Sequence, residues 1–239
     1  VYICSTMSLN IENIKKTKSN LSYPSQLFIN GKYQKSISEK SFENISPIDG
    51  KVVNQVFFAE QEDIDLAVSK AKETFNKGYW SNLSPGERKK ILLKFAILLE
   101  RDRLELSLLD TIDMGKTIND TYNADLPTSI DNIEWYAEII DKLFDDISPS
   151  SKEYLGLITK EPIGVVAAIV PWNYPLWMAI WKIAPALITG NSVILKPAEQ
   201  SPMSAIKIGA LLSEAGVPDG VFSVLPGDGP ITGKSLCLH

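Results

Sequence analysis

The pattern of apolar and polar residues over the first hundred positions of this 239-residue chain predicts short strands followed by helices. An apolar run stands directly before Asn30-Gly31, the dipeptide most typical of a tight hairpin turn, and residues 51–58 form a second strand-like run. From Gln61 to Asn76, apolar residues recur at helical spacing. Ser84-Pro85-Gly86-Glu87 has the form of a capping box and predicts another helix that reaches about residue 101.

Helices are expected to continue to Phe144, after which the pattern changes. Tyr154 to Lys160 predicts an exposed strand that needs a partner, and the β-branched run Gly164 to Val170 predicts a parallel strand covered on both faces. Helical and strand-like segments then alternate, with a helix at residues 176–189, a strand at 192–196, a helix at 202–215 and a strand at 221–225. This βαβαβ order predicts an α/β fold with a right-handed parallel sheet.

Composition places the chain among ordinary soluble globular proteins, with 44% hydrophobic and 22% charged residues. A net charge of -5 gives no electrostatic reason to expect nucleic acid or an anionic membrane as a partner. The most apolar stretch, residues 162–181, contains Asn173 and two interrupting prolines, which favours a buried strand and a helix over a membrane span. Two cysteines, Cys4 and Cys237, argue against a disulfide framework, and with no secretory signal expected they favour the cytoplasm.

Two segments leave the carboxyl ends of predicted parallel strands, where open α/β sheets bind ligands: Pro171 to Pro175 and Leu195 to Gln200. Lys196 and Glu199 can both reach one ribose there, and such a carboxylate repels a 2′-phosphate, which favours NAD over NADP. On spacing alone, a solvated ion pair is the commoner explanation of this lysine and glutamate. Asn173, taken alone, is more often a turn residue that bonds to its own backbone.

Several segments, in order and spacing, together resemble the aldehyde dehydrogenase superfamily. They are Phe28 to Gly31, Asn44 to Pro47, Asp113 to Lys116, Pro171 to Pro175, Trp181 to Leu187, Gly190-Asn191, Leu195 to Pro202 and Glu214 to Pro218. The resemblance covers the chain from about Leu27 to His239. It implies an incomplete Rossmann-like sheet of an NAD-binding domain, preceded by a helical segment and an oligomerisation arm.

The resemblance divides the chain into four expected parts: a tail at residues 1–22, strands and helices at 23–143, the arm at 144–162, and the first half of the dinucleotide-binding sheet at 163–239. Within the tail, the polar and basic residues 11–20 favour a solvated segment over a targeting element.

The resemblance also implies site residues. Asn173 is expected to donate its side-chain amide to the oxyanion of the reacting aldehyde, a role worth ~3 kcal/mol in comparable sites. Lys182 matches a position described as a charge relay, although a helix-surface lysine is an equally good explanation. The positions that match cofactor contacts are Ile169, Val170, Pro171, Trp172, Asn173, Lys196, Pro197, Ala198, Glu199, Gly229 and Gly233.

Four residues match the aldehyde path of the family: Tyr174, Trp177, Met178 and Trp181. Core packing is the default explanation of such a stripe, but an aromatic box of Tyr174 and Trp181 would hold a cationic group. This resembles the aminoaldehyde and betaine-aldehyde branch and suggests γ-aminobutyraldehyde or betaine aldehyde as substrate. Ile45, Asp113 and Gln200 match a monovalent-cation site, with an ordinary capping role for Asp113 as the alternative.

Family chemistry needs a cysteine nucleophile and a glutamate base, and the motifs that carry them are not found in this sequence. We assign neither Cys4 nor Cys237 as nucleophile, and we expect the 239-residue chain to be inactive alone. The first hypothesis is therefore that the chain is part of an NAD-dependent aldehyde dehydrogenase, which forms a homodimer or homotetramer at full length. The alternative is a non-catalytic nucleotide-binding or assembly module.

Overall fold

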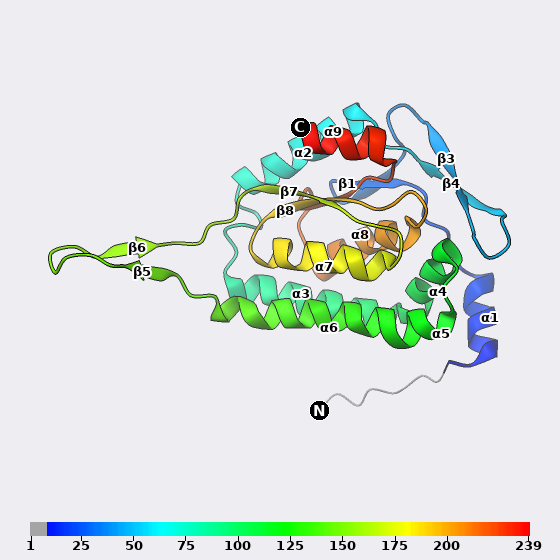
Figure 1. Cartoon of the computed structure of the whole chain (residues 1–239), viewed down its shortest axis with the longest axis horizontal. Helices are drawn as coiled ribbons and strands as arrows, with labels where there is room; N and C mark the ends of the chain where they lie inside the picture. The colour runs from blue at the N-terminus through cyan, green and yellow to red at the C-terminus, as the bar shows by residue number, and fades with distance from the viewer. Residues whose placement is uncertain (1–8) are drawn as a thin grey trace.

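A five-stranded sheet lies at the centre of the computed structural model, which describes residues 9–239 (Figure 1). The strand order is β2-β1-β9-β8-β7. The strands are β1 Leu27–Ile29, β2 Lys32–Gln34, β7 Val165–Ile169, β8 Ser192–Lys196 and β9 Phe222–Val224. β7, β8 and β9 are parallel, which confirms the sheet predicted from the alternating pattern.

The sheet also contains strands that the sequence did not place in it. β1 runs antiparallel to β9 through the pair Phe28 and Val224, and β2 pairs with β1. All three residues of β1 are buried, because this apolar run packs between two layers of helices. The predicted hairpin turn is confirmed: Asn30 and Gly31 both have positive φ, 52° and 76°, as a tight turn of this kind requires.

β7 differs from its prediction as a strand covered on both faces. It is the edge strand of the sheet, Ala168 is buried within it, and Ala167 and Ile169 are exposed. Ala167 and Ile169 are two residues apart and point to the same face, so this face of β7 is not covered there. An apolar run shows that a strand can be covered, whereas the packing of helices on the sheet decides whether it is. β8, by contrast, is buried along its whole length, since it lies between β7 and β9.

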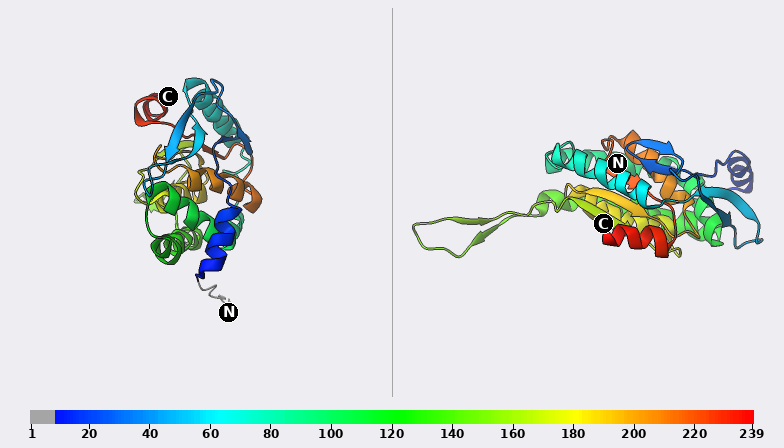
Figure 2. Two further views of the ribbon diagram at one scale, coloured as in Figure 1. Left: turned by 90° about the vertical axis from the view of Figure 1, so that its right-hand side faces the viewer. Right: turned by 90° about the horizontal axis from the view of Figure 1, so that it is seen from above.

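Helices form layers on both sides of the sheet (Figures 1 and 2). α2 and α9 lie on one face, α7 and α8 lie on the other, and α3 and α6 form a further layer against α7 and α8. Their bounds are α1 Ile11–Ser19, α2 Gln61–Asn76, α3 Pro85–Arg101, α4 Arg103–Met114, α5 Ile118–Asp120, α6 Leu126–Ile139, α7 Pro175–Ile188, α8 Met203–Ala215 and α9 Lys234–Leu238. The π-helical segments η1 Thr121–Asp125 and η3 Gly229–Gly233 and the 3-10 turn η2 Ile140–Lys142 complete the helical elements.

Local sequence signals explain the helix boundaries. α2 has the predicted bounds, and the capping box before α3 is present: Ser84 N donates to Glu87 Oε2 at 2.8 Å, and Glu87 N donates to Ser84 Oγ at 3.3 Å. α8 ends at Gly216, whose φ of 114° requires glycine. The strand and helix predicted for the apolar stretch 162–181 are β7 and α7. No helix within residues 9–239 is both long and apolar enough to cross a membrane.

A buried arginine fastens the C-terminal end of α7 to the outer helical layer. Arg88 Nε donates to Ile188 O at 2.8 Å, and Nη1 donates to Ser81 O at 3.3 Å and to Leu83 O. Trp80 Nε1 donates to Leu187 O at 2.8 Å beside it. Burial lowers the pKa of Arg88. These contacts fix the position of α7, whose opposite end carries the candidate site.

Two segments outside the central layers differ from their predictions. Residues 11–20 were expected to be a solvated tail, and they are solvated, but Ile11–Ser19 forms a helix whose N-terminus is capped by Asn10, which accepts a hydrogen bond from Asn13 N at 2.9 Å. Helix α1 lies beside α4 and has no buried residue. Residues 1–8, the start of the predicted tail, lie outside the described part of the chain.

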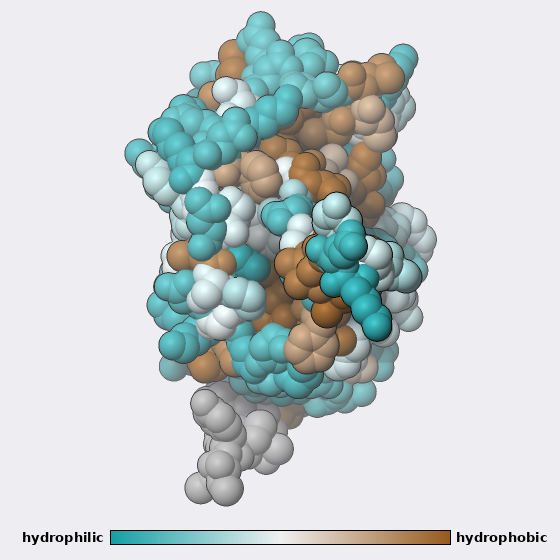
Figure 3. Space-filling model, turned by 90° about the vertical axis from the view of Figure 1, so that its left-hand side faces the viewer, coloured by the Kyte–Doolittle hydropathy of each residue, from teal (hydrophilic) through white to brown (hydrophobic). Residues whose placement is uncertain are grey.

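The strand predicted within Tyr154–Lys160 has its partner in the same chain. β5 Asp146–Ser148 and β6 Gly156–Ile158 form an antiparallel hairpin that projects from the body (Figure 2). β3 Ser41–Ile45 and β4 Val52–Phe57 form a second separate hairpin. The face from which the β5-β6 arm projects carries both hydrophobic and hydrophilic residues (Figure 3).

Candidate functional site

The two segments predicted to bind ligands lie side by side at the carboxyl ends of β7 and β8. Ile169 is paired in register with Lys196, and Val170 N donates to Lys196 O at 3.1 Å. Just beyond the strands, Ser201 Oγ donates to Trp172 O at 3.2 Å. The parallel register therefore brings the Pro171–Pro175 and Leu195–Gln200 segments together at the carboxyl ends of the two strands.

Lys196 is buried and Glu199 reaches solvent. Lys196 Nζ donates to Pro197 O at 2.9 Å and lies 3.6 Å from Glu199 Oε2. Burial lowers the pKa of Lys196, and the Glu199 charge opposes that change. The Glu199 side chain is 39% exposed and accepts from Gln200 Nε2 at 3.0 Å. The pair thus exists, but its lysine is buried rather than solvated, so ordinary surface pairing does not describe it.

Gly233, which follows the last strand, lies beside Lys196 and Ile169. A Cβ on Gly233 would stand 3.8 Å from Lys196 Cδ and 3.9 Å from Ile169 Cδ1, and a Cβ on Gly229 would have no neighbour within 4 Å. Thr232 Oγ1 donates to Ala59 O at 2.6 Å and anchors η3. Pro197 and Ala198 are buried behind this surface. This surface combines the apolar Ile169, the Lys196 ammonium, the Glu199 carboxylate and the uncrowded Gly229. Such a combination suits the ribose and base of a dinucleotide.

Asn173 is exposed in the turn that precedes α7. Within residues 9–239 its side-chain amide makes no hydrogen bond, so the alternative of a turn residue bonded to its own backbone finds no support there. Lys182 is also exposed, and its Nζ lies 5.2 Å from the centroid of the Trp181 ring. This position suits the helix-surface explanation of Lys182.

The predicted aldehyde-path residues lie along the start of α7, and the aromatic box of Tyr174 and Trp181 stays a prediction. Tyr174 stacks edge-on against Trp177, with ring centroids 5.2 Å apart, and Met178 is half-buried against the core. Trp181 is two helical turns farther on, about 10 Å along the axis. A lysine contacts the aromatic ring at each end of this set of residues. Lys116 Nζ lies 4.0 Å from the Tyr174 ring centroid, and Lys182 Nζ lies 5.2 Å from the Trp181 ring centroid.

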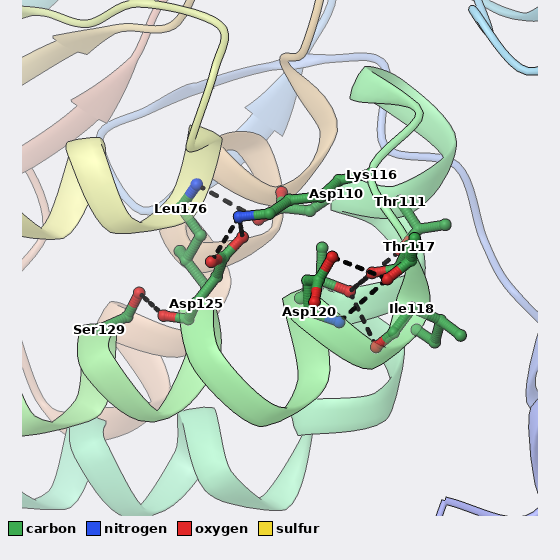
Figure 4. Close-up of polar contacts among 10 residues, drawn as sticks. Asp110, Thr111, Lys116, Thr117, Ile118, Asp120, Asp125, Ser129 and Leu176 are labelled. Atoms are coloured by element: carbon green, nitrogen blue, oxygen red, sulfur yellow. Dashed lines mark hydrogen bonds and ion pairs between the residues drawn. The ribbon is translucent and has the colours of Figure 1, made fainter.

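Three charged residues under the start of α7 were not singled out individually from the sequence (Figure 4). Lys116 Nζ donates to both carboxylate oxygens of Asp125, at 2.7 and 2.6 Å. Asp110 Oδ2 accepts from Leu176 N at 3.5 Å at the start of α7, and burial raises the pKa of Asp110 to about 7. The sequence signal that could have identified Asp110 is its acidic side chain at a position of the α4 helical pattern where an apolar residue is expected.

The three residues predicted to hold a monovalent cation line one cavity of about 430 Å³. The lining residues are Phe42, Glu43, Ile45, Pro47, Asp113, Met114, Trp172, Glu199 and Gln200. Asp113 already accepts from Asn44 Nδ2 at 2.7 Å and from Met203 N at 2.9 Å, and burial raises its pKa to about 8. It therefore caps α8, as the alternative explanation supposed, and the cation site stays a prediction.

Residues 33–239 match the aldehyde dehydrogenase family. The chain belongs to this family. It is 44% identical over 220 residues to the NADP/NAD-dependent aldehyde dehydrogenase PuuC of Escherichia coli K12, covering 92% of this chain and 44% of that protein. It is 39% identical to an aminoacetaldehyde dehydrogenase of Pseudomonas aeruginosa, covering 98% of this chain and 47% of that protein.

Solved aldehyde dehydrogenase structures have the same fold. P. syringae AldA, an indole-3-acetaldehyde dehydrogenase in complex with NAD+ and IAA, superimposes with a TM-score of 0.94 at 46% identity. The aldehyde dehydrogenase KauB of P. aeruginosa superimposes with a TM-score of 0.95 at 45% identity. Each comparison covers 97% of this chain and 47% of the other. This aldehyde dehydrogenase chain thus spans about half the length of the relatives it matches.

Proposed function

We propose that this chain is the cofactor-binding part of an aldehyde dehydrogenase that oxidises an aldehyde to the carboxylic acid with NAD. The observation that carries the proposal is the meeting of Ile169, Lys196 and Gly233 at the carboxyl ends of β7 and β8. Lys196 donates to a ribose hydroxyl, Glu199 accepts from the ribose, and Gly233 leaves room for the base. When bound, NAD accepts the hydride that leaves the aldehyde carbon.

Asn173 is the proposed oxyanion donor of this reaction. Its exposed amide follows β7 directly and stands at the entry to α7, next to the proposed cofactor surface. An amide held in that place stabilises negative charge on the aldehyde oxygen in the transition state. We assign the nucleophile and the base to the part of the relatives that this chain does not match, since it covers 44% and 47% of the two relatives compared above. A charge-relay role of Lys182 stays a prediction.

The proposal is tested by joining this chain to the segment of the E. coli relative that follows the matched span. The fusion should form NADH from a simple aldehyde such as propanal, whereas the 239-residue chain alone should form none. In the fusion, Asn173→Ala should lower kcat by about 10²-fold or more and leave the Kd of NAD nearly unchanged. The exposed Asn13→Ala is the matched control. An unchanged kcat contradicts the oxyanion role, and absence of NAD binding contradicts the cofactor site.

The substrate class is a narrower question. The sequence suggested an aminoaldehyde such as γ-aminobutyraldehyde or betaine aldehyde, and the name of the P. aeruginosa relative supports an amine at the far end of the aldehyde. Structures of similar identity are named for indole-3-acetaldehyde and for γ-glutamyl-γ-aminobutyraldehyde, whose far ends differ. Because the relatives are named for aldehydes with different far ends, their names do not identify one substrate class. The residues around Tyr174 are therefore better evidence for the substrate class.

Assembly through the β5-β6 arm is the second proposed role, and it also accommodates the alternative of a non-catalytic module. The arm exposes Ile147, Leu155 and Leu157 by 65% or more, which is unusual for apolar residues without a partner. We propose that it pairs with a second copy in a homodimer or homotetramer. Sedimentation of the chain should show association that Leu155→Glu with Leu157→Glu abolishes and Lys152→Glu retains; a monomeric parent chain contradicts this role. A cytoplasmic location stays a prediction from the low cysteine content.

A further inference from the structure

The turn that carries Asn173 receives little support from its own backbone. Residues 171–174 connect β7 to α7 without being part of either element. Among the backbone hydrogen bonds of the described residues, the one from Val170 N to Lys196 O is the last before the turn, and the next is accepted by Tyr174 O at the start of α7. The position of Asn173 therefore depends on contacts made by side chains of other segments.

A buried serine makes one such contact. Ser201 is 1% exposed, and its Oγ donates to Trp172 O at 3.2 Å. That oxygen belongs to the peptide unit whose nitrogen is Asn173 N. Because a peptide unit is planar, a bond that holds its oxygen also fixes the positions of Asn173 N and Cα. The serine hydroxyl thus restricts the direction in which the Asn173 side chain leaves the turn.

Ser201 is itself held in the segment that carries the proposed ribose contacts. Its N donates to Ala198 O at 3.2 Å, in the turn that follows Lys196. Pro202 restricts the backbone of Ser201 from the other side. The hydroxyl therefore joins the two segments that leave the carboxyl ends of β7 and β8 (Figure 1). One of these segments carries the proposed cofactor contacts, and the other carries the proposed oxyanion donor.

Capping of α8 is the ordinary explanation of a serine at this place. Serine is favoured just before a helix, where its hydroxyl accepts from a backbone N–H of the first turn. In this chain Met203 N, at the start of α8, donates instead to Asp113 Oδ2 at 2.9 Å. Within residues 9–239 the Ser201 hydroxyl bonds to Trp172 O and to no atom of α8. A capping role does not explain that contact.

We propose that Ser201 is a positioning residue of the oxidation, whose hydroxyl holds the Trp172–Asn173 peptide and thereby fixes the Asn173 amide for the aldehyde oxygen. The inference rests on the proposed function, which makes Asn173 the oxyanion donor. Ser201 acts through Asn173 and does not act on the aldehyde itself. A misplacement of about 1 Å can lower a rate by about 10²-fold, so loss of this one contact should be measurable in kcat.

Kinetics of the fusion with the segment of the E. coli relative test this role. Ser201→Ala should lower kcat by about tenfold and change the Kd of NAD by less than about twofold. Ser201→Thr keeps the hydroxyl and should keep at least about half of the parent kcat. Ser192→Ala is the matched control and should leave kcat unchanged, since Ser192 is also 1% exposed and donates to Ala71 O at 3.3 Å, at the first residue of β8.

A double-mutant cycle separates positioning of Asn173 from general damage. In a fusion that already carries Asn173→Ala, Ser201→Ala should lower kcat by less than about twofold, because the residue through which Ser201 acts is gone. A full further loss of about tenfold in that background overturns the proposal. An unchanged kcat of Ser201→Ala alone also overturns it, as does an equal loss in Ser192→Ala, which would reflect the removal of any buried hydroxyl.

NMR of the 239-residue chain separates this inference from the proposed oxidation. The heteronuclear NOE of the Asn173 backbone N–H is measured in ¹⁵N-labelled chain. In the parent chain it should be as high as in β7, and Ser201→Ala should lower it while Ser192→Ala leaves it unchanged. If it falls but the parent fusion forms no NADH, the hold on the turn is supported and the proposed oxidation fails. An unchanged NOE in folded Ser201→Ala overturns the inference, whether or not the fusion is active.

Discussion

Asp110 should make this chain less stable as the pH rises, and Asp110→Asn should reduce that dependence, to which the buried Asp113 also contributes. The carboxyl group is completely buried, with only Leu176 N donating to its Oδ2. The buried hydroxyl of Ser204 lies near this carboxyl group and opposes the rise of its pKa, but among the described residues neither Asp110 Oδ1 nor Ser204 Oγ makes a hydrogen bond of normal geometry. Burial raises the pKa of Asp110 to about 7 from its ordinary 3.8. The folded chain therefore keeps this proton in a pH range where the unfolded chain has lost it.

The sign follows from proton linkage. Between about pH 4 and pH 7 the folded state binds more protons at Asp110 than the unfolded state does, so the free energy of unfolding falls as the pH rises through this range. A pKa raised from 3.8 to about 7 corresponds to about 4 kcal/mol at most. Relaxation and water entry around the ionised group reduce such values, so we expect about 2 kcal/mol between pH 5 and pH 8.

Urea unfolding followed by tryptophan fluorescence at pH 5 and pH 8 measures this effect. Asp110→Asn keeps the shape and the acceptor for Leu176 N, and its amide is able to donate toward Ser204. Relative to the parent chain, the variant should gain about 2 kcal/mol on going from pH 5 to pH 8. Asp131→Asn, at an exposed position of α6, is the control and should show no such gain. An equal difference between Asp110→Asn and the parent chain at both pH values would refute the reasoning.

Two other substitutions test the cofactor site and the packing of α7, which carries part of that site. In the fusion described above, Glu199→Gln should raise the NADP-to-NAD ratio of kcat/KM by about tenfold, because it removes the carboxylate that repels a 2′-phosphate; an unchanged ratio contradicts the ribose role. Arg88→Met should lower the free energy of unfolding by about 3 kcal/mol, since three backbone carbonyls lose their buried donor. A loss below about 1 kcal/mol in urea unfolding would show that Arg88 does not fasten α7.

The candidate site was predictable as far as its positions in the chain. Lys196, Glu199 and Gly233 were named from the order of strands and turns and from a family resemblance, and their segments do meet at one edge of the sheet. The sequence could not predict the burial of each side chain or the residues that it contacts. The burial of Lys196, the capping of α8 by Asp113 and the contact of Lys116 with Tyr174 all join residues from different elements.

The sequence by itself determined the elements whose signals are local. The helical spacing of residues 61–76, the capping box at Ser84 and the Asn30-Gly31 turn each depend on residues within a few positions of one another, and each has the predicted form. Only the tertiary structure decided that β1 joins the sheet beside β9, that β5 pairs with β6, and that β7 lies at an edge. Those outcomes depend on which distant segments pack together, a choice among long-range contacts that a local pattern does not encode.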